Sequence, residues 1–196
     1  MLSISIPKEF RNRFFFILFL LFSLIFFSCS EETINKKKGI TIKNGIVYEL
    51  GTNQTYTGKV TDTLSGQIMS YEVVDGIKNG KFSVKDLNGK TIMEGLLKNN
   101  KNEGKWRYYY PNGKLESEGD FVSDTVEGKW SWYYEDGIIK EEGFFKNGKR
   151  EGVWILYDKE GKVKSTMNFK KGTKISENIQ NNFFAGIIAD RQTGIN

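Results

Sequence analysis

Hydrophobic and polar positions recur along most of this 196-residue chain with a period of 24 residues. A large aromatic residue marks each period, and a glycine stands two places before it. Apolar and polar residues alternate around these positions, as in β-strands that bury one face. The aromatic column consists of Phe82, Trp106, Trp130 and Trp154. The period predicts one structural unit copied several times in an elongated array.

Each unit contains a turn signal between two strand-like segments. The signals are Asn88-Gly89, Asn112-Gly113, Asp136-Gly137 and Glu160-Gly161. Asn-Gly between β-formers favours a two-residue type I′ turn. Such a turn would place Trp106 opposite Gly119 and Tyr110 opposite Leu115 on one face of a hairpin. The same register pairs Gly104 with Phe121, Trp130 with Gly143, Gly128 with Phe145, and Phe82 with Gly95.

In this register the glycines leave room for the large rings, so we interpret them as packing residues. The predicted repeat core comprises Phe82, Trp106, Trp130, Trp154, Gly95, Gly119, Gly143, Phe121, Phe145 and Phe169. We expect an all-β fold, an elongated antiparallel meander of 24-residue β-hairpins over residues 40–174. Its aromatic face must be covered or curled inward, because large exposed apolar patches are unusual.

The period changes after residue 174, where Ile175, Ile179, Phe183 and Ile187 lie four residues apart. This spacing predicts a short amphipathic helix in the segment 175–196, with Ser176 as its N-cap. We expect the helix to cap the open end of the sheet. A helix that binds a partner or touches a membrane is the alternative.

The opposite face of the predicted sheet carries Tyr109, Tyr133 and Tyr157 in register, and it pairs Arg107 with Glu118. It also pairs Lys105 with Asp120. Tyrosine and arginine are frequent at binding hot spots, so these tyrosines and Arg107 are the candidate partner-binding residues. Alternatively, the tyrosines only cover the stems of nearby lysines and arginines.

The first 28 residues combine a basic segment with an apolar one. Lys8, Arg11 and Arg13 precede an apolar run, Phe14 to Phe27, which is short for a membrane span of about 20 residues. The run ends just before Cys29, and together these features resemble the signal peptide of bacterial lipoproteins, which implies that Cys29 is the lipid-attachment residue. Residues 29–39 then form a polar tether. An uncleaved membrane anchor is the alternative. Lipidation predicts the bacterial cell envelope, with the outer membrane or cell surface favoured over the inner membrane.

The composition argues against catalysis. The chain has no histidine and one cysteine, which removes Ser/His and Cys/His nucleophile pairs and ordinary zinc sites. We therefore expect no enzyme, cofactor or metal. The remaining catalytic candidates are the carboxylate pairs Glu116 with Glu118 and Glu141 with Glu142. A net charge of +5 without a basic cluster does not indicate nucleic-acid binding.

The segments Gly104 to Tyr109, Asn112 to Lys114, Glu118 to Phe121 and Glu127 to Trp130 resemble the variant MORN repeat of bacterial YwqK-type antitoxins. The resemblance covers about residues 40–174. It implies a meander of hairpins and no catalytic residue. We expect a non-enzymatic, membrane-anchored scaffold that recognises a protein or an envelope polymer. A toxin-neutralising protein is the alternative, and pairing of two copies as a homodimer stays open.

Overall fold

The structure is a computed structural model that describes residues 33–35 and 39–179. It divides into two units, one ending at Thr55 and one beginning at Tyr56. The first unit holds a small antiparallel sheet of β1 (Thr33–Asn35), β2 (Ile40–Lys43) and β3 (Ile46–Glu49). Strand β1 lies within the segment predicted as a tether. Cys29 and the apolar run before it lie outside the described residues.

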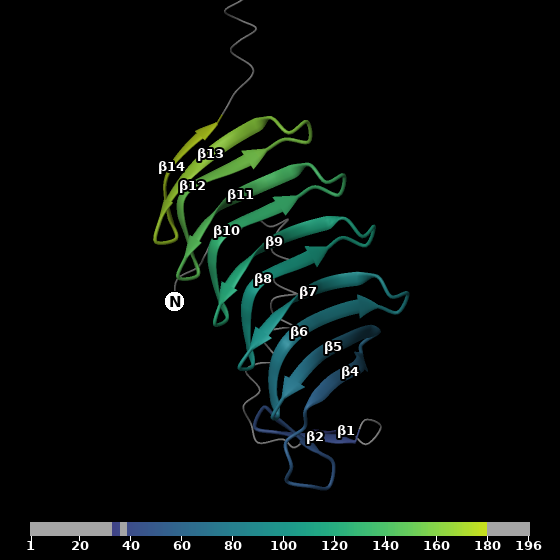
Figure 1. The fold of residues 1–196 in the computed structure, drawn as a ribbon. Coiled ribbons are helices and arrows are strands. Elements are labelled where there is room, and N and C mark those ends of the chain that lie inside the picture. The colour runs from purple at the N-terminus through teal and green to yellow at the C-terminus, as the bar shows by residue number, and fades with distance from the viewer. Residues whose placement is uncertain (1–32, 36–38, 180–196) are drawn as a thin grey trace, which may run out of the picture. The chain divides into compact units, whose positions relative to one another are not determined.

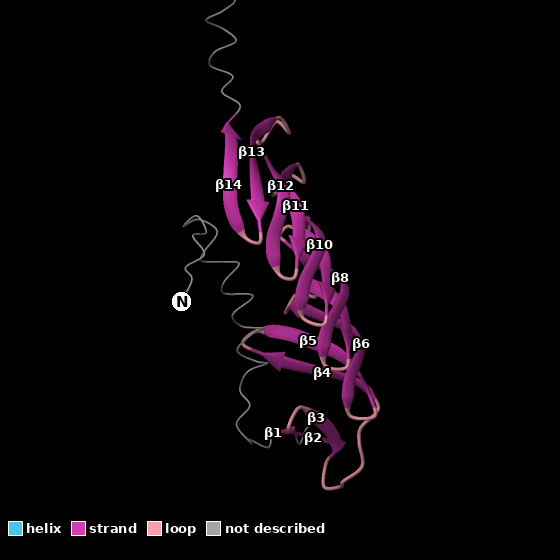
Figure 2. Ribbon diagram, turned by 90° about the vertical axis from the view of Figure 1, so that its left-hand side faces the viewer, coloured by secondary structure: helices cyan, strands magenta, loops and turns pink. Residues whose placement is uncertain are grey.

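The second unit is one antiparallel sheet whose eleven strands follow each other in chain order (Figures 1 and 2). The strands are β4 (Gly58–Leu64), β5 (Gln67–Val74), β6 (Ile77–Asp86), β7 (Thr91–Lys98), β8 (Lys101–Tyr109), β9 (Leu115–Val122), β10 (Thr125–Tyr133), β11 (Ile139–Lys146), β12 (Lys149–Tyr157), β13 (Val163–Lys170) and β14 (Thr173–Ile179). The predicted all-β antiparallel meander is confirmed. No helix in the described residues is long and apolar enough to cross a membrane.

The predicted register is present within each hairpin. Trp106 lies opposite Gly119, and Arg107 lies opposite Glu118. Gly104 with Phe121 and Lys105 with Asp120 are also partners, as are Trp130 with Gly143, Gly128 with Phe145, and Phe82 with Gly95. The alternation of the sequence specifies this register because a slip of one residue would expose every core side chain.

The turn at Asn112-Gly113 differs from the prediction. Only Gly113 has a positive φ, of 84°, and the Gly113 amide donates to the Tyr110 carbonyl. The same turn is closed by Gly89, Gly137 and Gly161 in the other units, so a three-residue loop with a glycine at its last position is a feature of the repeat. A bulge follows, and Leu115 pairs with Tyr109, so the expected pair with Tyr110 is wrong.

The two-residue turns with two positive φ angles lie at the other end of the strands. Ser123 and Asp124 have φ of 48° and 69°, and Asn147 and Gly148 have 51° and 72°. These angles are typical of type I′ turns, which match the twist of the flanking strands. The turn from one unit to the next is therefore the tight one.

A bulge near these tight turns shifts the aromatic rings. On β8, Glu103 pairs with Leu96 and Arg107 pairs with Glu94, so three residues of β8 lie against Gly95 alone. Gly104 begins the bulge with a φ of 63°, which favours glycine. Equivalent bulges begin at Gly128 and Gly152, with φ of 74° and 69°.

The glycines make room for rings as predicted, but the bulge changes which ring each glycine accommodates. A Cβ added to Gly95 would overlap the Trp106 ring, and one added to Gly119 would overlap the Trp130 ring. Gly143 is likewise covered by Trp154. Each indole thus lies on the glycine of the preceding hairpin, because the bulge carries the ring across the neighbouring strand.

The rings form a continuous column along one face of the sheet. Figure 1 shows that the strands of this sheet are bent. Trp106, Trp130 and Trp154 are at most 1% exposed. Phe121 contacts both Trp106 and Trp130 edge-on, with ring centroids 5.9 and 5.7 Å apart. The aromatic face has therefore curled inward. The sequence analysis missed two members: Tyr108 is 5% exposed, and Trp132 lies 5.6 Å from both Trp130 and Trp154.

The predicted capping helix does not begin where expected. Thr173–Ile179 form β14, which pairs with β13 after the tight turn Lys171-Gly172. The open edge of β13 offers backbone hydrogen bonds that favour a strand, and Ile175 and Ile179 are β-branched. Ser176 is thus a strand residue. The rest of the predicted cap, from residue 180, lies outside the described residues.

Candidate functional site

The candidate site is the outer face of the repeat sheet, opposite the aromatic column. Tyr109, Tyr133 and Tyr157 end β8, β10 and β12 on this face and are partly buried. Alternation along each strand separates them from the buried Trp106, Trp130 and Trp154. The sheet therefore repeats the same tyrosine at every second strand.

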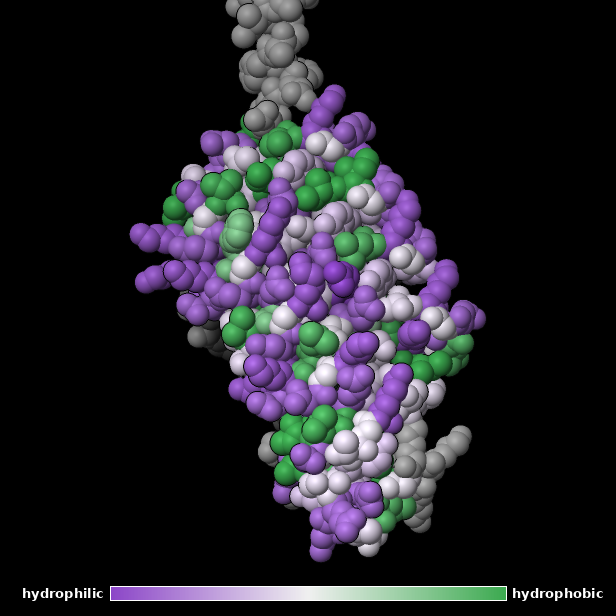
Figure 3. All heavy atoms as spheres, viewed as in Figure 1, coloured by the Kyte–Doolittle hydropathy of each residue, from purple (hydrophilic) through white to green (hydrophobic). Residues whose placement is uncertain are grey.

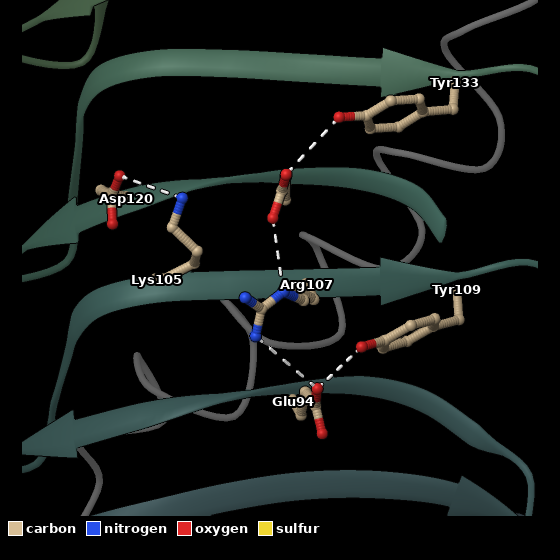
Figure 4. Close-up of polar contacts among 7 residues, drawn as sticks. Glu94, Lys105, Arg107, Tyr109, Asp120 and Tyr133 are labelled. Atoms are coloured by element: carbon tan, nitrogen blue, oxygen red, sulfur yellow. Dashed lines mark hydrogen bonds and ion pairs between the residues drawn. The ribbon is translucent and has the colours of Figure 1, made fainter. Parts of the chain in front are cut away.

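Each tyrosine hydroxyl donates to a glutamate on the preceding odd-numbered strand, and Figure 4 shows this for Tyr109 and Tyr133. Tyr109 reaches Glu94 at 2.7 Å, and Tyr157 reaches Glu142 at 2.9 Å. Tyr133 reaches Glu118 at 3.5 Å. We call these three pairs the tyrosine-glutamate ladder. The glutamates of the ladder were recognisable in the sequence, since Glu94, Glu118 and Glu142 also recur every 24 residues.

The ladder shifts the pKa of its tyrosines. Burial, and then the hydrogen bond to Glu94, raises the pKa of Tyr109 to about 12. Burial is also the main cause that raises the pKa of Tyr133 and of Tyr157. The hydroxyls therefore stay protonated donors near neutral pH, and their rings are held in fixed orientations.

Cations link successive steps of the ladder. Arg107 Nε lies 3.3 Å from Glu118, and Arg107 Nη1 lies 4.0 Å from Glu94, so one guanidinium bridges two glutamates. Lys129 Nζ lies 2.7 Å from Glu142, and its hydrogen bond is the main cause that lowers the pKa of Glu142. Both cations are exposed, so each ion pair contributes little stability.

The last unit loses this polar pattern. Val153 stands where earlier units have Lys105 and Lys129, and Thr166 stands where they have the ladder glutamates. Val153 and Phe144 are each 55% exposed. Figure 3 shows a mainly hydrophilic surface with smaller hydrophobic patches. The outer face is therefore most polar in its middle units.

The structure separates the two carboxylates of one candidate pair and engages Glu118 of the other. Glu141 is 6% exposed and Glu142 lies on the outer face, because neighbours along a strand point to opposite sides. Glu118 is bound by Arg107 and Tyr133. Among the described residues, no group of three or more acidic, histidine or cysteine side chains could hold a metal ion.

Glu141 belongs to a charged cluster on the inner face. Arg150 Nη1 lies 3.0 Å from Glu141, and the guanidinium lies 3.8 Å from the centre of the Trp154 ring. Burial raises the pKa of Glu141, and Arg150 opposes that rise. Burial lowers the pKa of Arg150. The cluster covers the last indole of the column, which indicates a structural role.

Comparison with protein families supports the repeat assignment. Residues 102–123, 126–147 and 150–171 match a family model described as the MORN repeat variant. Residues 102–171 hold three variant MORN repeats. Each matched segment begins just before the bulge glycine of an even-numbered strand and ends in the next tight turn. The MORN match thus coincides with the bulged hairpin unit of the structure.

Other comparisons add no function. A search of curated proteins found no match. Among solved structures, a mutant of S. aureus TarM in complex with Fondaparinux, alpha-GlcNAc-glycerol and UDP shares 12% identity, with a TM-score of 0.27. The alignment covers 69% of this chain and 23% of the TarM chain, so this chain spans less than a quarter of that protein.

Proposed function

We propose that this chain is a non-enzymatic, membrane-anchored lipoprotein that recognises a protein or an envelope polymer with the outer face of its MORN sheet. The anchoring part rests on the sequence, where basic residues and an apolar run precede Cys29. The recognition part rests on the outer face. Its site of action would be the bacterial cell envelope, with the outer membrane or cell surface favoured.

The tyrosine-glutamate ladder is the observation that carries the recognition proposal. Binding costs less when side chains are already ordered, and each ladder hydrogen bond fixes one tyrosine ring before a partner arrives. Arg107 lies between two ladder steps with its guanidinium exposed. Tyr109, Tyr133 and Arg107 therefore present ordered rings and a cation on one surface. The same hydrogen bonds also join neighbouring strands, so each variant is compared with wild type in both binding and stability.

Photo-crosslinking in the native host tests recognition. A crosslinking amino acid at Lys105, exposed on the outer face two residues from Arg107, should give a defined adduct, whereas the same group at Lys162, in an exposed turn, should give little. Tyr109→Ala with Tyr133→Ala should lower the adduct yield at least about tenfold, the equivalent of 1.4 kcal/mol. The control Lys159→Ala with Lys162→Ala should leave the yield unchanged. An unchanged yield in the tyrosine variant, with the fold intact, would contradict the proposal.

Metabolic labelling with an alkyne fatty acid tests the anchor. Wild-type protein should incorporate label and Cys29→Ala should not. Protease added to whole cells should cleave the repeat domain if it lies on the surface. Label that persists in Cys29→Ala, or no label in wild type, would remove the lipoprotein assignment without affecting the recognition proposal.

The second candidate is a toxin-neutralising protein, which rests on the resemblance of residues 40–174 to the YwqK-type repeat. An exported chain would act on a secreted or contact-delivered toxin, since it would not meet a cytoplasmic one. A toxin gene next to this one, and rescue of growth when both are expressed, would favour this candidate. Growth arrest that persists despite expression of this chain would exclude that pairing.

A further inference from the structure

The outer face of the sheet becomes apolar in its last unit. Val153, on β12, stands where the earlier units have Lys105 and Lys129. Phe144, on the neighbouring strand β11, stands where the earlier unit has Asp120. Both apolar side chains are exposed to solvent. Two positions that carry charge in the middle of the sheet are therefore hydrophobic near its end.

Ile155 extends this apolar surface along β12. It lies two residues after Val153, so the two side chains share the outer face. The equivalent residue of the earlier unit is Arg107. We call Phe144, Val153 and Ile155 the apolar outer patch. Exposed apolar side chains that are grouped on one face are typical of contact sites.

The same chain carries an apolar segment just after the sheet ends. Strand β14 ends at Ile179, and the residues that follow lie outside the described part of the chain. Their sequence has three polar residues and then the run Phe183-Phe184-Ala185-Gly186-Ile187-Ile188. Large apolar side chains of this kind are favourably removed from water.

The apolar outer patch is within reach of this segment. Ile155 pairs with Thr166, and Thr166 pairs with Asn178 near the end of β14. Cross-strand partners share a face, so Asn178 lies on the outer face two strands from Ile155, at about 10 Å. The four residues from 180 to 183 span up to about 13 Å, which is enough for Phe183 to reach the patch.

The polar units lie beyond that reach. Lys105 is on β8, six strands and about 29 Å from β14. Phe184, five residues after the last strand residue, reaches at most about 18 Å. The outer face is therefore apolar in the unit next to the exit of the chain and charged in the units farther away.

We propose that the segment Phe183–Ile188 packs on the apolar outer patch, so that the chain's own C-terminal segment covers the last unit of the outer face. A short connection holds the segment at an effective concentration on the order of millimolar, which favours it over a separate partner. This contact does not use Tyr109, Tyr133 or Arg107, so it is independent of the proposed partner. It also differs from the cap expected from the sequence, which would cover the open edge of the sheet.

A double-mutant cycle tests the contact in the full-length chain, reconstituted in phosphatidylcholine vesicles. Val153→Lys introduces the residue that the earlier units carry, so the strand accommodates it. Phe183→Ser with Phe184→Ser removes the rings of the segment. Each variant should lower the urea midpoint of unfolding, followed by tryptophan fluorescence, by about 0.5 M, because each removes the same apolar contact. The combined variant should lower the midpoint no further than either change alone.

Val122→Lys is the matched control, because Val122 is as exposed as Val153 and lies on β9, five strands from β14. Its effect should add to that of the serine variant, as expected for separate sites. Additive effects of Val153→Lys and the serine variant would overturn the proposal. An unchanged midpoint in Val153→Lys would also overturn it, and would indicate that a separate partner covers the patch. Coupling that disappears when the protein is diluted in the vesicles would overturn it in favour of a second copy of the chain.

Discussion

At the scale of residues, each indole of the column depends on a glycine eleven positions earlier in the chain. Trp106, Trp130 and Trp154 lie on Gly95, Gly119 and Gly143. Each indole N–H donates to a backbone carbonyl beside its glycine, as Trp106 does to Leu96 at 3.2 Å. A large ring and a missing side chain thus form one packing unit.

Substitution of the glycine should disrupt this unit. Gly143→Val would collide with Trp154, and overpacking of this kind should lower the free energy of unfolding by about 3 kcal/mol. Met167→Val is the matched control, because Met167 occupies the same repeat position as Gly143 but the neighbouring strand, β14, has no indole. This substitution should lower the free energy of unfolding by less than about 1 kcal/mol. Urea unfolding followed by fluorescence measures both. Equal costs would show that the rings do not lie on the glycines.

Adjacent glutamates on β11 should respond to pH in opposite directions. The pKa of Glu142 is lowered in the folded chain, so its contribution to stability is present above the ordinary carboxyl pKa and is lost as pH falls. The pKa of Glu141 is raised, so its contribution is lost as pH rises through the same window. Glu142→Gln should therefore flatten the loss of stability between about pH 6 and 3, whereas Glu141→Gln should steepen it. Identical profiles of unfolding free energy against pH would contradict this assignment.

At the scale of elements, tight turns and bulges set how one hairpin packs on the next. The type I′ turns connect units, and their amides bond back to the preceding turn, as Gly148 does to Val126. Glu103, Glu127 and Glu151 accept hydrogen bonds from turn amides twenty residues later. These contacts align the turns of successive units along one side of the sheet.

The turn at Lys171 offers a test at this scale. Lys171 has a φ of 50°, a conformation that asparagine adopts more readily than lysine. Lys171→Asn should raise the free energy of unfolding by about 0.5 kcal/mol, and Lys171→Val should lower it by about 1 kcal/mol. Thermal unfolding of the two variants checks the order. A more stable valine variant would contradict the type I′ assignment.

At the scale of the whole molecule, the sheet is a linear array in which each strand contacts its neighbours. Stability in such arrays is approximately a sum over units and their interfaces. The column of rings agrees with this, because each indole contacts only rings of its own unit and of adjacent units. An additional copy of the unit should therefore fold when it is inserted between existing units.

Insertion of one more unit tests that property. A second copy of residues 125–148 placed after Gly148 adds two strands that start and end at type I′ turns. The lengthened chain should fold and unfold at a higher urea concentration than wild type. The control insertion lacks Ser131, which moves the following strand residues to the opposite face, and it should unfold at a lower concentration than wild type. A lengthened chain that is less stable would mean that the units are not equivalent.

Much of the fold could be predicted from the sequence, because the same pattern of residues recurs every 24 positions. The 24-residue spacing and the alternation within each unit determined the strands, their register and which face carries Trp130 rather than Tyr133. The tyrosines and Arg107 were placed correctly on the outer face. The residues that bind them, Glu94 and Glu142, were not recognised, because a cross-strand contact between hairpins depends on the bulge.

What the sequence determined by itself was therefore the unit, its two faces and the resemblance to variant MORN repeats. The tertiary structure decided which glycine each indole covers, which turns are tight, and that Thr173–Ile179 form a strand. These features depend on backbone geometry and on contacts between units: a bulge moves Trp106 across to Gly95, the Gly113 amide closes a longer turn on Tyr110, and the open edge of β13 favours a strand over the predicted helix. Local periodicity encodes contacts within a hairpin, whereas the packing of one hairpin on the next follows from backbone geometry that no single spacing reveals.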